Sequence, residues 1–142
     1  MKPENNSRPR IAVFAYSEVG SACLDDLIKD DANVVVVYTH EDDPGEEIWF
    51  RSVKETALNN SIEVRTPSKI DSMETDHLRQ IGPELIFSFY YRAMIPKEVL
   101  DIPRLGAYNI HGALLPKYRG RACVNWAVIN GEKETGATLH VM

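Results

Sequence analysis

Residues 11–39 read IAVFAYSEVGSACLDDLIKDDANVVVVYT, a strand pattern followed by a helix pattern and a second strand pattern. The two outer runs, Ile11–Tyr16 and Val34–Thr39, are almost entirely apolar, as is typical of strands that are buried on both faces of a sheet. Between them, the apolar residues of Ser21–Asp30 recur at helical spacing. Because a helix between two buried strands is the crossover that parallel strands need, the stretch predicts a parallel sheet.

The same alternation continues to Met142. Further helices are expected over Ile48–Asn59, from an Asp71-x-x-Glu74 capping box to Gln80, from Pro96 to Leu100 and over Ala122–Asn130. Further strands are expected over Ile62–Arg65, Leu85–Phe89, Gly106–His111 and Thr135–Met142. The sequence therefore predicts an α/β protein with a Rossmann-like three-layer fold, in which helices cover both faces of a mostly parallel sheet. Trp49 and Trp126 share helical spacing with other apolar residues, so both are expected in the core.

The composition favours one globular domain. Of the 142 residues, 44% are hydrophobic and 26% are charged, fractions that are ordinary for a soluble protein. Residues 1–9 are expected to be a disordered tail, and residues 10–142 to form the domain. Cys23 and Cys123 lack the spacing of a zinc site or a disulfide framework. Because there is neither a bilayer-spanning apolar run nor a secretory signal, a cytoplasmic protein without a membrane partner is expected.

The charge distribution argues against nucleic acid as a partner. The net charge is −5, with 9 basic and 16 acidic residues in positions 1–80, and 7 basic and 5 acidic residues in positions 81–142. Acidic proteins bind phosphate backbones poorly, whereas the more basic second part leaves room for a small anionic ligand. The first strand–helix turn, residues 15–21, has one glycine where a dinucleotide-binding turn needs three. A nicotinamide cofactor is therefore not expected.

Asn109 and His111 are candidates for catalysis. They lie two positions apart at the end of an expected strand, so their side chains point to the same face of the sheet. An amide can donate to an oxyanion and an imidazole can move a proton, which suits attack of a nucleophile on a carbonyl carbon. The alternative is that both are strand-end polar residues that bind a loop.

Three stretches carry a family resemblance: NIHGALLPKYRG at residues 109–120, THEDDPGE at 39–46 and FSFYYR at 87–92. The first resembles the signature of the 10-formyltetrahydrofolate-dependent formyltransferases. The other two resemble the amino-sugar branch of that family, the UDP-4-amino-4-deoxy-L-arabinose formyltransferases of polymyxin resistance. The likeness runs from Ile11 to Met142. It implies an N-terminal formyltransferase catalytic domain that uses 10-formyltetrahydrofolate as formyl donor and needs no metal.

The resemblance also implies roles for individual residues. Asn109 would stabilise the tetrahedral oxyanion, and His111 would accept and donate the proton. The residues expected to hold the folate are Ala93, Met94, Ile95, Leu114, Pro116 and Arg121. The residues expected to meet the acceptor substrate, including its phosphates, are His40, Lys117, Tyr118 and Arg119.

Two features depart from the family pattern. Ala113 stands where the family has a serine. The third catalytic residue of the family, an aspartate that raises the pKa of the histidine through its opposite charge, would lie beyond Met142. The domain is therefore expected to be truncated at its C-terminal end and poorly active alone. A last strand whose outer edge is unpaired can pair with another chain, so association through the C-terminal end is a further expectation.

The implied reaction is transfer of a formyl group to the amine of a nucleotide-linked amino sugar. The alternatives are a methionyl-tRNA formyltransferase, which the acidic charge disfavours, and a glycinamide ribonucleotide formyltransferase. A non-catalytic, truncated folate-binding remnant is a further alternative, suggested by Ala113 and by the missing aspartate.

Overall fold

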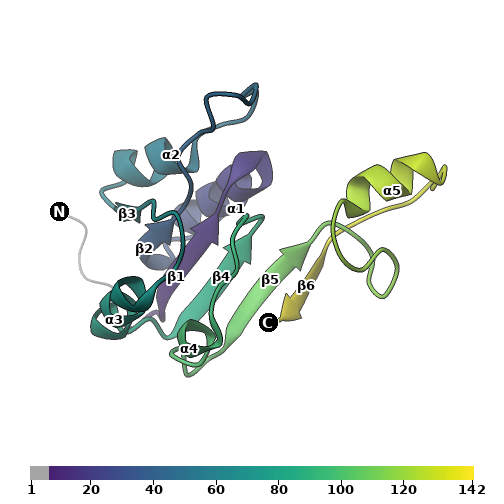
Figure 1. The fold of residues 1–142 in the computed structure, drawn as a ribbon. Helices are drawn as coiled ribbons and strands as arrows, with labels where there is room; N and C mark the ends of the chain where they lie inside the picture. The colour runs from purple at the N-terminus through teal and green to yellow at the C-terminus, as the bar shows by residue number, and fades with distance from the viewer. Residues whose placement is uncertain (1–6) are drawn as a thin grey trace.

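Six strands form one sheet in the computed structural model, which describes residues 7–142 (Figure 1). The strands are β1 (Arg10–Ala15), β2 (Asn33–Tyr38), β3 (Glu63–Arg65), β4 (Leu85–Phe89), β5 (Ala107–His111) and β6 (Thr138–Val141). Their order across the sheet is β3-β2-β1-β4-β5-β6. Neighbouring strands are parallel except β6, which runs antiparallel to β5. The expected mostly parallel sheet is confirmed.

Helices cover both faces of this sheet. They are α1 (Ser17–Lys29), α2 (Val53–Asn59), α3 (Ser72–Ile81), α4 (Lys97–Leu100) and α5 (Cys123–Ile129). On one face, Leu24 of α1 and Val53 of α2 pack with apolar strand residues in one core cluster. On the other face, Leu78 of α3 and Val99 of α4 belong to a second cluster. The three layers expected from the sequence are therefore present.

Strand β1 lies at the centre of the core because its side chains alternate between the two clusters. Ala12 and Phe14 belong to the cluster under α3 and α4, while Val13 and Ala15 belong to the cluster under α1 and α2. All four side chains are fully buried. A strand with a helix layer on each side needs apolar residues at every position, which explains the unbroken apolar run.

Two helices begin at places that differ from the expectation. Helix α1 begins at Ser17 rather than Ser21, so Gly20 lies inside the helix instead of in the preceding turn. A Cβ atom on Gly20 would lie 3.1 Å from the carbonyl oxygen of Phe89, so glycine lets α1 approach β4 closely. Helix α2 begins at Val53 rather than Ile48, after Ser52, whose side chain accepts a hydrogen bond from the Glu55 amide.

The expected burial of the two tryptophans was wrong. Trp49 precedes α2 instead of lying within it, and 77% of its surface is exposed. Trp126 lies in α5 but is 53% exposed. Spacing alone cannot distinguish a helical face that meets the core from one that meets solvent.

Residues 112–137, here called the arm, connect β5 to β6 and project from the body of the protein (Figure 1). The large apolar side chains of α5 that are exposed on the arm are Val124, Trp126, Val128 and Ile129. Strand β6 exposes Leu139 and Val141. Association through these residues stays a prediction.

The expected tail, residues 1–9, falls mostly outside the described residues. Within the described part, Arg8 forms an ion pair with Asp30 at 3.8 Å. The domain boundaries stay a prediction. Residues 7–142 contain no helix that is both long enough and apolar enough to cross a membrane.

Candidate active site

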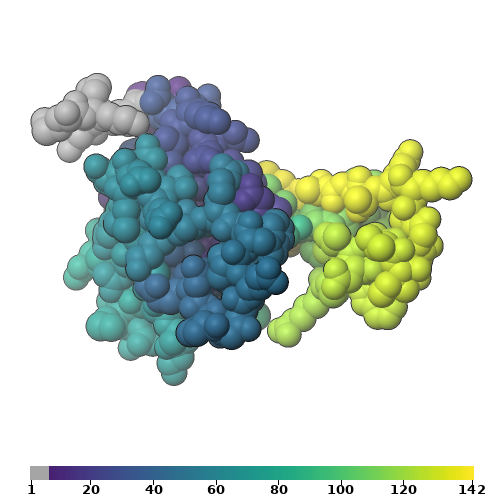
Figure 2. Space-filling view, turned by 90° about the horizontal axis from the view of Figure 1, so that it is seen from above, coloured from purple at the N-terminus to yellow at the C-terminus, as the bar shows by residue number. Residues whose placement is uncertain are grey.

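The parallel strands all end at the same edge of the sheet, and the loops that follow β1, β2, β4 and β5 gather there. This edge faces the viewer in Figure 2, where a notch separates the arm from the blue segment that follows β2. Ligands of open α/β sheets bind outside the carboxyl ends of the strands. The residues expected to be functional after β2, β4 and β5 therefore lie at one edge.

Asn109 and His111 lie in the second half of β5, as the sequence predicts. Asn109 is opposite Ser88 of β4 on one side and opposite His140 of β6 on the other. Its side-chain nitrogen, Nδ2, lies 3.2 Å from Nε2 of His140. Because Nδ1 of His140 lies 3.0 Å from the carbonyl oxygen of Val141, Nδ1 carries the hydrogen and Nε2 accepts one from Asn109. This bond uses one of the two N–H groups of the amide.

The His111 ring is fixed by the arm. Its Nε2 atom lies 2.7 Å from the carbonyl oxygen of Tyr118. A carbonyl can only accept, so Nε2 is the protonated nitrogen and Nδ1 keeps the lone pair that can accept a proton. The ring centroid is 6.4 Å from that of His140, with the two planes at 71°. An amide donor and two imidazoles thus lie close together at one end of the sheet.

His140 is a neighbour of the candidate site that the sequence did not suggest. Its contact with Asn109 depends on the antiparallel pairing of β6, which places His140 directly opposite Asn109. The one signal for His140 in the sequence is that a histidine lies within the run that predicts the last strand. The register of a neighbouring edge strand cannot be read from spacing within either strand.

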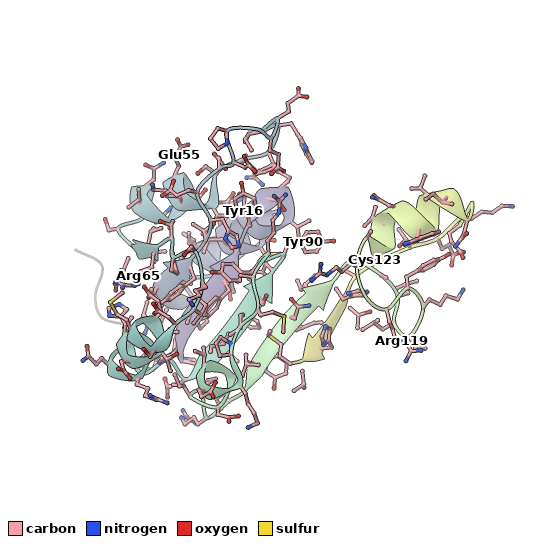
Figure 3. The ribbon with its side chains drawn as sticks, viewed as in Figure 1. Tyr16, Glu55, Arg65, Tyr90, Arg119 and Cys123 are labelled. Atoms are coloured by element: carbon pink, nitrogen blue, oxygen red, sulfur yellow. The ribbon has the colours of Figure 1, made fainter. Side chains whose placement is uncertain are left out.

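The loops after β4 and β5 touch through Tyr90 and Gly112. Tyr90 follows β4 in a left-handed conformation, with φ of 61°. Its hydroxyl lies where a Cβ atom on Gly112 would be. In Figure 3 the Tyr90 ring points from the end of β4 toward the beginning of the arm, near Cys123. The loop that is expected to hold folate, Ala93–Ile95, continues from this point, with Ile95 buried in the core and Met94 85% exposed.

The first turn of the arm is tied to β6. Thr138 donates from Oγ1 to the carbonyl oxygen of Ala113 at 2.8 Å and accepts from the Leu115 amide at 3.1 Å. Ala113 is fully buried. Leu114 is half exposed, and its Cδ2 atom lies 2.6 Å from where a Cβ atom on Gly136 would be. These contacts fix the position of Leu114 relative to β6, and Pro116, two residues further on, is exposed.

The residues expected to meet the acceptor substrate do not all gather in one place. Lys117 and Tyr118 line an open cavity of about 450 Å³ between the first turn of the arm and residues 131–135. The Tyr118 hydroxyl donates to Glu132 at 2.7 Å, and this bond raises the pKa of Tyr118 above its usual value. Arg119 lies at a loop of the arm and points away from the sheet (Figure 3). Arg119 and Arg121 are both exposed.

His40 lies apart from these residues, in a group formed by the loops after β1, β2 and β4. Its Nε2 atom accepts a hydrogen bond from the Arg92 amide at 3.0 Å. Its ring stacks on Tyr91, with centroids 4.3 Å apart, and meets Tyr16 edge to face. Burial, with the Arg92 charge as a second cause, lowers the pKa of His40 below its usual value. His40 is therefore neutral at physiological pH.

Tyr16 and Arg92 complete this group. The Arg92 guanidinium lies over the Tyr16 ring, 4.6 Å from its centroid, and forms two hydrogen bonds with Glu46 at 2.8 and 3.0 Å. The Tyr16 hydroxyl donates to Asp42 at 2.7 Å. Burial, followed by the bond to Asp42, raises the pKa of Tyr16 to about 12. The charge of Arg92 is thus balanced by a carboxylate within the protein.

The beginning of α1 also carries an acidic side chain. Glu18, in the first turn, accepts from the Arg51 amide at 3.1 Å and from Nε of Arg51 at 2.9 Å. These bonds lower the pKa of Glu18 below its usual value. Within residues 7–142 no three histidine, cysteine or acidic side chains are grouped so that they could hold a metal ion.

Comparisons with known proteins agree with this arrangement. A family model described as formyl transferase matches residues 9–142. The bifunctional polymyxin resistance protein ArnA of Wigglesworthia glossinidia brevipalpis is 48% identical over 135 residues, which cover 94% of this chain and 21% of that protein. The chain thus spans about a fifth of the length of this curated relative.

Solved structures share the fold. Glycinamide ribonucleotide transformylase 1 from Geobacillus kaustophilus superposes with a TM-score of 0.73 and 26% identity, over 94% of this chain and 74% of that chain. A formyltetrahydrofolate deformylase from Pseudomonas syringae pv. tomato superposes with a TM-score of 0.77 and 19% identity, over 95% of this chain and 46% of that chain. The second likeness shows the fold alone.

Proposed function

Because the chain belongs to the formyl transferase family, we propose that it transfers a formyl group from 10-formyltetrahydrofolate to the amine of a nucleotide-linked 4-amino sugar. The observation that carries the chemistry is the pair of Asn109 and His111 at the carboxyl end of β5, each with one side-chain nitrogen already bonded within the protein. Such bonds hold catalytic groups in place before the substrate arrives.

Asn109 supplies the donor for the developing negative charge. Its amide has a second N–H besides the one given to His140. This N–H donates to the formyl oxygen when the acceptor amine adds to the formyl carbon, and it weakens again when the carbonyl is restored. A donor that is fixed before the reaction stabilises the charge without the cost of reorienting.

His111 moves the proton. The amine loses a proton as its new bond to the formyl carbon forms, and Nδ1 of His111 accepts it. The bond between the formyl carbon and N10 of the folate then breaks, and His111 returns the proton to N10. His111 thus ends in the state in which it began, with Nε2 donating to the carbonyl oxygen of Tyr118.

Exposed apolar side chains on two loops support a binding site for a flat heterocycle. Leu114 and Met94 offer exposed apolar surface on two loops of the same edge, while Ala93–Ile95 offers main-chain donors and acceptors. Apolar walls with a few polar groups are usual for such ligands. We propose that Ala93–Ile95, Leu114, Pro116 and Arg121 hold the folate, and that Lys117, Tyr118 and Arg119 meet the acceptor.

The proposed amino-sugar acceptor is supported by the likeness to the polymyxin resistance protein. The alternative acceptor, glycinamide ribonucleotide, is supported by the likeness to the Geobacillus transformylase. Both acceptors and methionyl-tRNA can be compared in one assay with 10-formyltetrahydrofolate, in which mass spectrometry detects the formylated product. We expect formyl transfer to UDP-4-amino-4-deoxy-L-arabinose in preference to the other two.

The His111→Ala variant should lose the transfer. A matched control is His77→Ala, which replaces a histidine that bonds Glu63 on the far side of the sheet from β5. Preferred formylation of glycinamide ribonucleotide would reassign the acceptor. Equal rates for His111→Ala and for the unaltered protein would contradict the proposed proton transfer.

A further inference from the structure

We propose that His40 is a positioning residue, which holds the main chain that leads into the Ala93–Ile95 loop in the shape that binds the folate. The proposal rests on the proposed function for its ligand, but its structural part concerns a contact within this chain. It assigns His40 to the donor site, whereas the sequence pattern suggested the acceptor site.

The contact joins two loops that are not neighbours in the sheet. His40 follows β2 and Arg92 follows β4, with β1 between those two strands. Nε2 of His40 accepts the Arg92 amide hydrogen at 3.0 Å, across 52 positions of sequence. The bond therefore spans the carboxyl end of β1 and fixes one loop relative to the other.

The His40 ring is itself held in one orientation. It stacks on Tyr91 with centroids 4.3 Å apart and planes at 18°, and it meets the Tyr16 ring at 5.3 Å and 83°. A ring that is fixed on one face and at one edge keeps its Nε2 lone pair directed at one place. This makes His40 a rigid acceptor rather than a flexible surface side chain.

The segment that receives the bond has little other main-chain support. Residues 90–95 lie between β4 and α4, outside any helix or strand. Within residues 7–142, and apart from the pairing of β4 with β5, the Arg92 amide is the one main-chain N–H of this segment that forms a hydrogen bond. A segment with few backbone hydrogen bonds opens easily, so the loss of this one should loosen the loop.

The bond requires a neutral His40. The titratable and charged groups against the ring are Tyr91 and Arg92 from the loop after β4 and Tyr16, which follows β1. Asp42 and Glu46 of the loop that carries His40 bind Tyr16 and Arg92 respectively. Burial and the Arg92 charge both oppose protonation of His40. A proton on Nε2 would turn the acceptor into a donor that faces the Arg92 N–H, and the bond would break.

Two substitutions separate the hydrogen bond from the packing. His40→Phe keeps a flat ring for Tyr91 and Tyr16 but removes the acceptor. His40→Gln offers an amide oxygen at about the reach of Nε2 and loses the ring. His77→Phe is the matched control, because it replaces another partly buried histidine, whose Nε2 atom bonds Glu63.

The first measurement is amide hydrogen exchange of residues 90–95, read by NMR, which requires no folate. We expect His40→Phe to raise the exchange rate of the Arg92 amide by about fivefold or more, the worth of one hydrogen bond. His40→Gln should restore most of the protection. Because the pKa of His40 is lowered in the folded protein, the protection in the unaltered protein should persist below the pH at which an ordinary histidine is protonated and fall only at more acidic pH, and His40→Gln should show no such fall.

The second measurement is binding of 5-formyltetrahydrofolate, a stable isomer of the donor, followed by calorimetry. His40→Phe should weaken the binding by about five- to tenfold, while His40→Gln and His77→Phe should bind like the unaltered protein. Where transfer is measured, KM for the donor should rise and kcat should change little.

Either of two results would overturn the proposal. Unchanged exchange of the Arg92 amide in His40→Phe would show that the bond does not hold the loop. Faster exchange of the Arg92 amide with unchanged folate binding in His40→Phe would show that this bond does not shape the folate site. If the unaltered protein binds no folate while the exchange results hold, the failure lies in the proposed function and the contact itself stands.

Discussion

The Tyr90 hydroxyl occupies the place beside Gly112 where any other residue would carry its Cβ atom. This contact joins the loop after β4 to the first residue after His111. Gly112→Ala would drive a methyl group into the Tyr90 hydroxyl and to within 3.4 Å of the Cys123 sulfur. Overpacking of this kind costs about 1–3 kcal/mol, so we expect a loss of that size in the free energy of unfolding, measured with urea.

A double variant tests the cause of that loss. Tyr90→Phe removes the oxygen that meets the new methyl group, so Tyr90→Phe with Gly112→Ala should be more stable than Gly112→Ala alone. The coupling between the two substitutions should be at least about 0.5 kcal/mol. Additive effects would mean that alanine is disfavoured at position 112 for a reason other than this contact.

The ion pair between Glu74 and Arg65 predicts a specific loss of stability. Glu74 is buried and accepts from Arg65 at 2.7 and 2.9 Å and from the Tyr38 hydroxyl at 2.8 Å. Glu74→Ala leaves both donors without this acceptor, so we expect the free energy of unfolding to fall by about 3 kcal/mol. Asp76→Ala, an exposed acidic residue of the same helix, should change it by less than about 0.5 kcal/mol.

The same pair predicts a dependence on pH. The Arg65 hydrogen bonds hold the pKa of Glu74 below the value of 4.5 that an ordinary glutamate has. A depressed pKa in the folded state stabilises the protein fully above that value and is lost as the pH falls through the lower, folded-state pKa. Urea unfolding below pH 4.5 should therefore show a smaller acid loss in Glu74→Gln than in the unaltered protein. Parallel curves would argue against this assignment.

Two buried tyrosines should respond in opposite ways to the loss of the hydroxyl. Within residues 7–142 the buried Tyr91 hydroxyl has no hydrogen-bond partner, whereas that of Tyr38 donates to Glu74. Tyr91→Phe should leave the free energy of unfolding unchanged or raise it by about 1 kcal/mol, and Tyr38→Phe should lower it by about 1 kcal/mol. A clear destabilisation by Tyr91→Phe would reveal a partner for its hydroxyl.

Asn109→Ala tests the role of the amide. Loss of a fixed oxyanion donor lowers kcat by about 10²–10³-fold in enzymes of acyl transfer, and we expect a decrease in that range with little change in KM for the folate donor. His140→Ala removes the partner that orients the amide and should lower kcat less. An Asn109→Ala variant with normal kcat would exclude this residue from charge stabilisation.

The fold could be predicted from the apolar runs because both faces of this sheet are covered. β4 begins and ends at the expected residues, and β1, β2 and β5 each differ by only one residue at either end. The start of α2 was missed, although Ser52 and Glu55 have the spacing of a capping box. The apolar spacing predicted a start at Ile48. The observed start is instead determined by the Ser52 side chain, which accepts the Glu55 amide hydrogen.

The site was predictable only in part. The pair of Asn109 and His111 follows from alternation within one strand, which is a local property. The contacts of Asn109 with His140 and of Arg92 with His40 join segments 31 and 52 residues apart. They depend on the strand order and on the direction of β6, which no pattern within a single segment contains.

Glu18, in the first turn of α1, influences which ligands can bind at the turn between β1 and α1. The beginning of a helix attracts anions, and here the first turn already carries the Glu18 carboxylate, which is paired with Arg51. A phosphate group at this turn would meet an acidic side chain, whereas dinucleotide-binding sheets offer it a glycine-rich turn. Under the proposed function, we therefore expect the basic side chains of the arm, at the β5 end of the same edge, to meet the phosphates of the substrate.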